Sequence, residues 1–253
     1  MILDQFKLDG KVAIVTGSAR GLGQAMANGL AEAGADIALV DILDMSETKS
    51  QIEKLKRKCI AITADLGKKD CVNVIIKQTV EQLGGIDILF NNAGIIRRAP
   101  LVEFTEKDWD DVMNINIRTL FFLSQAAAKV MIKQDRGGKI VNTASLLSFQ
   151  GGILVPSYTA SKSAVMGLTR LLANELAPYK INVNAIAPGY MATDNTKALR
   201  ENPERNKAIL ERIPLGRWGK PEDLKGITVF LASAASDYMT GYTVAVDGGW
   251  LSR

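Results

Sequence analysis

Short apolar runs rich in Val and Ile alternate with longer segments of helical period along the whole chain. Strands that are apolar at nearly every position are buried on both faces, which is typical of a parallel sheet with helices on either side. No linker, repeat or low-complexity segment marks a boundary. The sequence therefore predicts the α/β class, with one doubly wound, Rossmann-type domain over residues 1–253. The predicted strands are 11–16, 36–41, 60–64, 86–90, 139–144, 181–187 and 242–246.

Segments with helical period separate these runs. After the first run, Leu22, Met26 and Leu30 recur every four residues, and Gly34 follows as the expected C-cap. The polar stretch 195–212 follows the sixth run, and we interpret it as a candidate mobile lid. The other predicted helices are 46–58, 68–83, 106–133, 157–177 and 221–233.

The chain contains no histidine and only two cysteines, Cys59 and Cys71. Without histidine, a Ser-His-Asp or Cys-His nucleophile has no base and a His-based zinc site cannot form. Two cysteines make neither a disulfide framework nor a thiolate site, so we expect no metal and a cytoplasmic location. The first residues lack signal-peptide features and no apolar run reaches the roughly 18 residues of a membrane span, so we expect no membrane partner.

The charge balance is mildly basic, with 31 Lys and Arg against 27 Asp and Glu. The one dense basic run, Lys54-Leu55-Lys56-Arg57-Lys58, is either a polyanion or targeting patch or the solvated end of the helix predicted at 46–58. We favour the helix end, because no basic arm or interleaved aromatic residue accompanies the run. The sequence therefore predicts no nucleic-acid partner.

The first strand-like run leads into the glycine-rich string TGSARGLG at 16–23. Gly17, Gly21 and Gly23 allow a tight turn and a close approach of the backbone to a phosphate, and the helix that follows supplies free N–H groups and a positive dipole end. The spacing differs from G-x-G-x-x-G, but a strand precedes the loop and a helix opens within it. We predict a pyrophosphate-binding loop.

Asp41 ends the second predicted strand, where a carboxylate can accept hydrogen bonds from both hydroxyl groups of an adenosine ribose. The same carboxylate repels a 2′-phosphate. Arg20 is a glycine-loop cation that can reach either a 2′-phosphate or the pyrophosphate. Because Asp41 decides against the 2′-phosphate, the sequence predicts NAD as the cofactor.

Polar residues also follow the third and fourth predicted strands. Asp65, next to Leu66, is placed to hydrogen-bond an adenine amino group, and Asn91-Asn92-Ala93-Gly94 forms a polar turn that lets a cofactor pass closely. Open parallel sheets bind ligands at the carboxyl ends of their strands. We therefore assign these turns to the same dinucleotide site.

Tyr158 and Lys162 are four residues apart at the start of the helix predicted at 157–177, so they share one helical face. A free phenol titrates near pH 10, and reaching pH 7 takes about 3 pKa units, or roughly 4 kcal/mol. Burial raises the pKa of a phenol and nearby cations lower it. With Lys162 and an oxidised nicotinamide as cations, Tyr158 is predicted to act as general acid and base.

Two further polar residues are predicted to complete the chemistry. Ser145 follows the fifth strand and is placed to hydrogen-bond the substrate oxygen. Asn116 lies inside a largely apolar helix, where an amide needs a partner, and we expect it to hold a water that links Lys162 to solvent. Each residue alone has a structural explanation, and the prediction depends on their joint order.

This ordered set resembles the short-chain dehydrogenase/reductase superfamily over nearly the whole chain. The matching strings are TGSARGLG (16–23), NNAG (91–94), Asn116, Ser145, YTASK (158–162) and PG (188–189). The resemblance implies an NAD(P)-dependent oxidoreductase with an Asn116-Ser145-Tyr158-Lys162 tetrad, commonly a homotetramer. It also implies that Thr193 contacts the nicotinamide carboxamide. Further cofactor contacts are implied for Leu22, Asp65, Leu66 and Asn92, beside Tyr158 and Lys162.

Longer strings, among them SLLSFQGGILVPSYTASKS (145–163), resemble members of this family that act on sugar acids with NAD in pectin and uronate breakdown. Arg97 and Arg98 follow NNAG, and we expect one of them to bind the substrate carboxylate. Gln150 and Tyr190 flank the expected pocket and are predicted to bind hydroxyl groups, beside Ser145 and Tyr158.

Other functions remain open on the sequence. One is another reductase of the same fold, such as a gluconate 5-dehydrogenase or a 3-oxoacyl-thioester reductase, although a thioester reductase usually takes NADPH and Asp41 argues against that. The other is a non-catalytic dinucleotide-sensing protein, which has no use for the intact tetrad.

Overall fold

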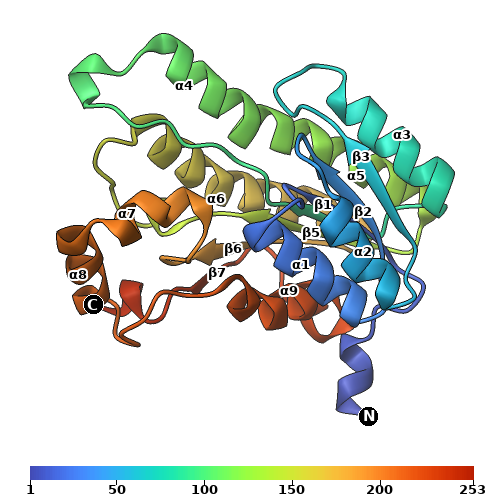
Figure 1. Ribbon diagram of the computed structural model, residues 1–253. Coiled ribbons are helices and arrows are strands. Elements are labelled where there is room, and N and C mark those ends of the chain that lie inside the picture. Colours follow the sequence, from blue (N-terminus) through green and yellow to red (C-terminus); the bar gives the residue numbers. More distant parts are fainter.

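A parallel sheet of seven strands forms the centre of the computed structural model of residues 1–253, in the order β3-β2-β1-β4-β5-β6-β7 (Figure 1). Every neighbouring pair in the sheet is parallel. The doubly wound α/β prediction is confirmed. The strands are β1 Val12–Thr16, β2 Asp36–Asp41, β3 Cys59–Thr63, β4 Ile88–Asn91, β5 Gly138–Thr143, β6 Ile181–Pro188 and β7 Thr243–Val246.

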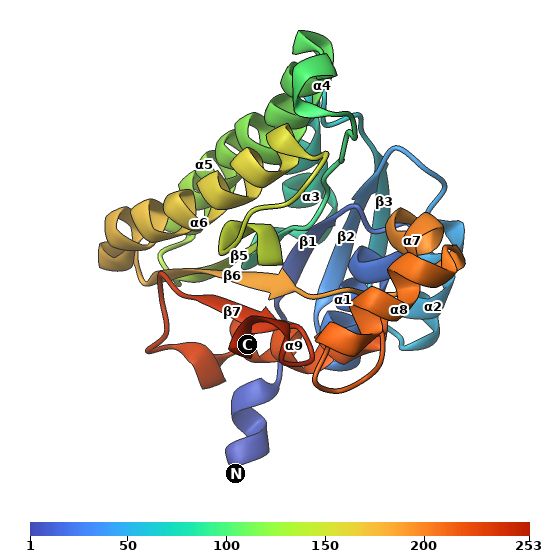
Figure 2. The same ribbon diagram turned by 90° about the vertical axis from the view of Figure 1, so that its left-hand side faces the viewer.

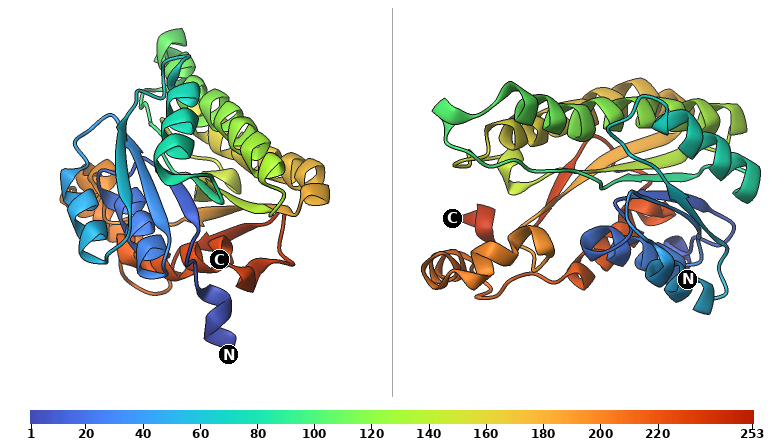
Figure 3. Two further views of the ribbon diagram at one scale, coloured as in Figure 1. Left: turned by 90° about the vertical axis from the view of Figure 1, so that its right-hand side faces the viewer. Right: turned by 45° about the horizontal axis from the view of Figure 1, so that its top comes forward.

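Helices cover both faces of the sheet (Figure 3). One face carries α1 (Gly21–Glu32), α2 (Ser46–Lys54) and α9 (Lys225–Ala232). The other carries α3 (Cys71–Leu83), α5 (Leu120–Gln134) and α6 (Pro156–Leu176). Because the order of the strands reverses between β1 and β4, a crevice for ligands is expected at the carboxyl ends of these two strands.

The remaining helices lie toward the carboxyl edge of the sheet. α4 (Glu106–Met113) runs into α5 through a π-helical segment, Asn114–Thr119. The short helices α7 (Lys197–Glu201) and α8 (Pro203–Arg212) lie side by side off the ends of the strands (Figure 2).

Side-chain alternation explains why both faces of each strand are apolar. In β1, Ala13 and Val15 join the core under α1, whereas Ile14 joins the core under α5. All three are fully buried. A strand between two helical layers therefore needs an apolar residue at every position, which is the pattern that marked these runs in the sequence.

The structure corrects two of the predicted helices and shows two helices within the polar stretch 195–212. α2 ends at Lys54 instead of 58, because Lys56 has a φ of +58° and Arg57 pairs with Asp36 at 2.9 Å. The helix predicted at 106–133 is interrupted by the π-helical segment, and the polar stretch 195–212 contains α7 and α8. The C-cap of α1 is Ala33 instead of the predicted Gly34, which follows it with a φ of +111°. None of the helices combines the length and the apolarity that crossing a membrane requires.

Candidate active site

The glycine loop turns sharply out of β1 and leads into α1. Gly17 has a φ of +68°, and a Cβ on it would lie 2.9 Å from the Asn92 amide nitrogen. A Cβ on Gly23 would overlap the Gly17 carbonyl oxygen. No side chain caps α1, so the N–H groups of its first turn are free. A side chain at Gly17 or Gly23 would push the loop apart, and the uncapped helix start has the geometry that binds a pyrophosphate.

Asp41 is fixed at the end of β2 by backbone N–H groups. Its Oδ2 accepts a hydrogen bond from Ala19 at 3.0 Å, and its Oδ1 accepts from Ile42 at 2.7 Å and from Leu43 at 3.1 Å. A carboxylate has about four acceptor positions, so one position remains for a ribose hydroxyl. The carboxylate therefore lies beside the glycine loop in a fixed orientation.

The NNAG turn after β4 is fastened to the glycine loop. Asn92 donates its amide to the carbonyl of Thr16 at 2.9 Å, and the Thr16 hydroxyl accepts from the backbone N–H groups of Asn92 and Ala93, both at 3.0 Å. Asn91 instead points into the interior, where its amide donates to Ser124 at 2.8 Å. Asn92 thus holds the crevice walls together, and Asn91 holds the sheet to α5.

The Asp65-Leu66-Gly67 turn after β3 is anchored to the helix across the sheet edge. Asp65 accepts from the N–H of Gly67 at 2.9 Å, and the carbonyl of Leu66 accepts from the Thr119 hydroxyl at 2.7 Å. Both Asp65 and Leu66 are half-buried. The second carboxylate oxygen of Asp65 keeps its acceptor capacity.

The segment after β6 reaches across to the glycine loop. A Cβ on Gly21 would lie 3.7 Å from the Thr193 methyl group, which places Thr193 against the loop. Arg20 forms an ion pair with Asp194 at 2.7 Å between exposed side chains. Arg20 therefore links the glycine loop to the residues that lead into α7. Asp41, the glycine loop and Thr193 therefore lie close together at the carboxyl ends of the strands. This arrangement can hold a nicotinamide dinucleotide that runs from Asp41 past Gly17 and Gly21 to Thr193.

Lys162 is a buried cation beside Tyr158. Its Nζ donates to the carbonyl oxygen of Thr143 at 2.6 Å and lies 5.5 Å from the centre of the Tyr158 ring. Burial lowers the pKa of Lys162 to about 8. The expected helical pairing of Tyr158 with Lys162 is present, because both belong to the first turns of α6.

Burial raises the pKa of Tyr158, whereas its hydrogen bond with Ser145 and the charge of Arg98 act in the opposite direction. Arg98 supplies this charge, while the ammonium of Lys162 donates to the Thr143 carbonyl. That Lys162 also lowers the pKa of Tyr158 stays a prediction. The protein by itself therefore holds Tyr158 as a neutral phenol, the form that donates a proton.

Asn116 lies in the π-helical segment and is 1% exposed. Its amide accepts from the N–H of Ile95 at 2.9 Å and donates to the carbonyl of Ile95 at 3.0 Å and to the Ser161 hydroxyl at 3.1 Å. Ser161 in turn donates to the Tyr158 carbonyl at 2.9 Å. Asn116 thus joins the loop after β4 to the helix turn that carries the phenol.

The two arginines after the NNAG turn have different surroundings. Arg97 pairs with Asp108 at 3.4 Å and with Asp111 at 3.5 Å on α4. Arg98 has no carboxylate partner, donates to the carbonyl of Asn195 at 3.4 Å and acts on the charge of Tyr158. Of the two arginines, Arg98 is therefore the one without a carboxylate partner whose charge acts on Tyr158.

Gln150 and Tyr190 lie on the side of the site that faces α8. The amide oxygen of Gln150 accepts from Arg212 at 3.1 Å and from the indole N–H of Trp250 at 3.2 Å. The Tyr190 ring packs 4.6 Å from the ring of Trp250, centre to centre. These contacts hold α8 and the last residues of the chain beside Leu146, the neighbour of Ser145.

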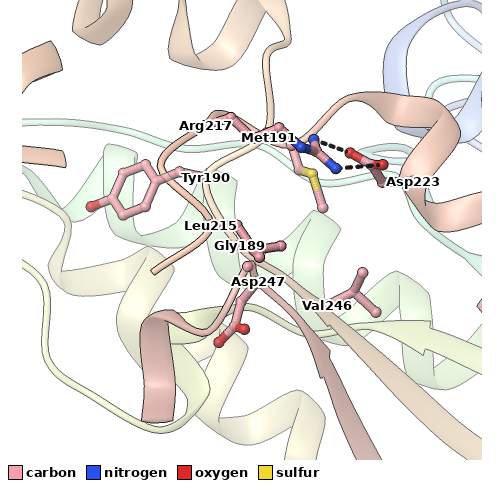
Figure 4. Close-up of a pocket in the computed structure, with 10 residues that line it drawn as sticks. Gly189, Tyr190, Met191, Leu215, Arg217, Asp223, Val246 and Asp247 are labelled. Atoms are coloured by element: carbon pink, nitrogen blue, oxygen red, sulfur yellow. Dashed lines mark hydrogen bonds and ion pairs between the residues drawn. The ribbon is translucent and has the colours of Figure 1, made fainter. Parts of the chain in front are cut away.

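A cleft of about 200 Å³ lies between the ends of β6 and β7 (Figure 4). Arg217 and Asp223 close one side with two hydrogen bonds of 2.7 and 3.0 Å, and the Tyr190 side chain points away from it. Asp247 accepts from the N–H groups of Gly249 and Leu251. The cleft contains none of the four tetrad residues and its carboxylates are satisfied by the chain itself.

Sequence reasoning missed two residues that organise the site. Thr16 joins the glycine loop to the NNAG turn, and its position at the end of a buried strand was a signal that could have found it. Arg200 on α7 donates to the Thr193 carbonyl at 3.0 Å, and its buried Nε has no partner. No local pattern marks Arg200, because only the fold brings α7 to Thr193.

The comparisons agree with this geometry. A family model described as enoyl-(acyl carrier protein) reductase matches residues 17–251. The chain belongs to the short-chain dehydrogenase/reductase family of oxidoreductases.

Two curated relatives span the full length of both chains: the 2-dehydro-3-deoxy-D-gluconate 5-dehydrogenases of Escherichia coli, 62% identical, and of Dickeya dadantii, 60% identical. A solved structure from Agrobacterium tumefaciens, described as a candidate 2-deoxy-D-gluconate 3-dehydrogenase with bound NADP, is 54% identical. It superposes with a TM-score of 0.92 and covers 99% of this chain and 100% of its own.

Proposed function

We propose that this protein interconverts 2-dehydro-3-deoxy-D-gluconate and its 5-keto form, 3-deoxy-D-glycero-2,5-hexodiulosonate, with NAD as the cofactor, in pectin and uronate breakdown. The observation that carries the proposal is the half-buried Tyr158, whose ring centre lies 5.5 Å from the Nζ of Lys162 on the same helical face, and whose pKa Ser145 and Arg98 lower against the effect of burial. The names of the two full-length relatives support the substrate. A nicotinamide dinucleotide supplies or accepts the hydride.

Each polar group of the site has a role in this reaction. Tyr158 is kept protonated by burial and donates its proton to the C5 oxygen when the ketone is reduced. The Ser145 hydroxyl holds that oxygen in line, and Lys162 exchanges protons with the buried cluster because its pKa of about 8 lies near neutrality. In the oxidation direction Tyr158 accepts the proton, and the Arg98 charge favours the phenolate.

The test of this chemistry is Tyr158→Phe, which removes the proton and keeps the ring. We expect turnover of the diketo acid to fall by at least about a hundredfold, as for loss of a general acid, with dinucleotide affinity unchanged. A panel containing 5-keto-D-gluconate, a 3-oxoacyl thioester and the diketo acid, read as loss of NADH absorbance, separates the rival reductases. Turnover retained in the folded variant would refute the assignment of Tyr158, and no turnover by the unaltered protein would favour a sensing role.

We propose NAD over NADP because a carboxylate at the end of β2, held beside the glycine loop as Asp41 is, would repel a 2′-phosphate. The NADP in the Agrobacterium structure makes a measurement with both cofactors necessary. Asp41→Ser removes the charge and keeps a hydrogen-bonding group. The ratio of kcat/KM for NADH to that for NADPH should fall by at least about tenfold, equal to 1.4 kcal/mol. An unchanged ratio would contradict the role of Asp41.

We propose that Arg98 binds the substrate carboxylate, and that Arg97, held by Asp108 and Asp111, does not. Arg98→Ala should raise KM for the diketo acid by about tenfold or more, the effect of losing a charged hydrogen bond, and leave KM for an uncharged diketone unchanged. Arg97→Ala is the matched control with the same charge change. Equal effects of the two substitutions would exclude carboxylate selection by Arg98.

Three further points belong to the proposal. Gln150 and Tyr190 are assigned to the substrate hydroxyl side, through the contacts that they make with Trp250. We propose a homotetramer, which light scattering on the purified protein tests directly. We also propose a cytoplasmic location, which fits a chain with two buried, unpaired cysteines.

A further inference from the structure

Arg200, on the short helix α7, is a cation that the proposed reaction leaves without a role. Its guanidinium donates to the carbonyl of Thr193 at 3.0 Å, and its buried Nε has no hydrogen-bond partner within the chain. The ion pair of α7 joins Lys197 to Glu201 instead. A buried donor without a partner is unfavourable, so the burial of this guanidinium does not by itself stabilise the fold. What Arg200 contributes is its one contact, with Thr193.

Thr193 and Asp41 contact different parts of the glycine loop. Asp41 accepts from the N–H of Ala19 at 3.0 Å, whereas the Thr193 methyl group lies 3.7 Å from the position that a Cβ on Gly21 would take, at the start of α1. A dinucleotide that has its adenosine ribose at Asp41 and its pyrophosphate at the start of α1 continues past Gly21. Its nicotinamide half is therefore the part that reaches Thr193.

The carbonyl of Thr193 is held by one group inside its own turn and by one group outside it. Inside the turn, it accepts from the N–H of Thr196 at 3.2 Å. The Thr196 hydroxyl lies closer to the carbonyl of Met191, at 2.6 Å, than to that of Thr193, at 3.0 Å, so its single proton goes to Met191. The guanidinium of Arg200 is therefore the charged donor on the Thr193 carbonyl, and hydrogen bonds from charged groups are the stronger ones.

α7 brings Arg200 to this carbonyl although the helix itself is weakly held. It has five residues, and none of them is buried. A helix of this length does not persist on its own. Leu199, the neighbour of Arg200, packs against the apolar cluster that α8 shares with Trp250. These two residues therefore fix α7 beside the Thr193 turn.

We propose that Arg200 is a positioning residue: it holds Thr193 against the start of α1, so that the Thr193 side chain meets the nicotinamide half of a bound dinucleotide. This role rests on the proposed function, because it requires a dinucleotide in the site. Arg200 does not act on the adenosine half, since Asp41 is held by the backbone N–H groups of Ala19 and Ile42. Loss of the guanidinium should therefore weaken binding of the nicotinamide half alone.

The experiment compares two ligands by calorimetry on the full-length protein. NADH and ADP-ribose share the adenosine, the pyrophosphate and the second ribose, and only NADH carries the nicotinamide. The test variant is Arg200→Met, which keeps an apolar stem and removes the guanidinium, and Arg200→Lys keeps a cation that can donate to the carbonyl. The matched control is Arg205→Met on α8, because Arg205 is exposed, its side chain forms no ion pair and the charge change is the same.

We expect Arg200→Met to raise the dissociation constant of NADH about tenfold, the effect of losing one charged hydrogen bond, and that of ADP-ribose less than about twofold. Arg200→Lys should bring the constant for NADH back to within about threefold of that of the unaltered protein, and Arg205→Met should change neither constant.

Three results would overturn the positioning role. One is NADH binding that Arg200→Met leaves unchanged. Another is an equal loss of both ligands, because Arg200 would then support the whole site or bind the pyrophosphate. The third is that the unaltered protein binds neither ligand, in which case the proposed function fails and Arg200 has no dinucleotide to act on.

A double variant tests whether the effect passes through Thr193. Thr193→Val removes the hydroxyl and keeps the shape of the side chain. If Arg200 acts only by placing Thr193, Arg200→Met should weaken NADH binding by less than about twofold further in the Thr193→Val background. An additive loss of about tenfold would show that Arg200 reaches the cofactor by another route, and it would refute the positioning role.

Discussion

The hydroxyl of Thr16 connects the glycine loop to the NNAG turn by hydrogen bonds. Removing it tests how much these hydrogen bonds contribute to stability and to dinucleotide binding. The hydroxyl donates to the Phe90 carbonyl at 3.3 Å and accepts from the N–H groups of Asn92 and Ala93. Thr16→Val keeps the shape of the side chain and removes the hydroxyl. Asn92 N–H and Phe90 C=O still bond to each other at 3.1 Å, so the Ala93 N–H is the group left without a partner.

A fully buried donor without a partner costs about 1–3 kcal/mol, and the Ala93 N–H is only half-buried, so we expect Thr16→Val to lower the free energy of unfolding by about 1 kcal/mol. The same loosening should raise KM for the dinucleotide. Thr228 on α9 provides a matched control, because its hydroxyl is fully buried and has no hydrogen-bond partner. Thr228→Val should leave stability unchanged or raise it by up to about 1 kcal/mol.

Urea unfolding of both variants at one protein concentration measures the difference, since assembly makes apparent stability depend on concentration. A KM measurement on the same preparations tests the link to the cofactor. If Thr16→Val is no more destabilising than Thr228→Val, the hydroxyl does not hold the two loops together. If its stability falls and KM does not change, the NNAG turn is structural and does not touch the dinucleotide.

Three other substitutions test separate parts of the structure. Gly23→Ala should weaken dinucleotide binding at least about tenfold in a fluorescence titration. Gly167→Ala is the control, because a Cβ there meets nothing within 4 Å; it should keep dinucleotide affinity and stabilise α6 by about 0.5–1 kcal/mol. Equal dinucleotide affinities of the two variants would contradict the packing of the loop. Lys162 has a folded pKa of about 8, below its unfolded value, so its burial destabilises the protein below pH 8 and this penalty fades as the pH rises. We expect Lys162→Met to be inactive and more stable than the unaltered protein by about 1–3 kcal/mol at pH 7. A difference in stability that does not shrink above pH 8 would refute the assignment. Arg217 lowers the pKa of Asp223 to about 2, which stabilises the folded protein above pH 4, and this stabilisation is lost as the pH falls toward 2. Because the pair is partly exposed, Asp223→Asn should lower the free energy of unfolding by only about 1 kcal/mol at pH 7. The melting temperature of the variant should also fall less steeply between pH 4 and pH 2.

The strands and the glycine loop could be predicted from the sequence because each rests on local physical requirements. A strand covered on both faces must be apolar throughout, and β2 was predicted with its observed bounds. The end of α2 could not be predicted from local sequence, because Arg57 pairs with Asp36 at the start of β2, about 20 residues earlier in the chain. The π-helical turn at 114–119 leaves no mark in hydrophobic period, since it shifts only a few residues of an otherwise helical segment.

The two adjacent arginines show a limit of a different kind. Arg97 and Arg98 have the same chemistry and follow the same motif, so no local argument could choose between them. The fold places Asp108 and Asp111 of α4 beside Arg97, whereas Arg98 donates to the Asn195 carbonyl and its charge acts on Tyr158. The position of α4 determines that Arg97 is paired with carboxylates and Arg98 is not, and this position depends on the whole fold.

For Tyr158 and Lys162, helical spacing predicted that the two side chains would be neighbours but not how their charges would act. Burial opposes the charge on Lys162 as well as on Tyr158. It therefore moves the two pKa values apart, that of the lysine down to about 8 and that of the tyrosine above its usual value, so that at neutral pH Lys162 keeps its charge and Tyr158 keeps its proton. A pocket of this kind stores the proton on Tyr158 for reduction. Oxidation needs additional positive charge, which Arg98 supplies in part and the oxidised nicotinamide supplies when it is bound.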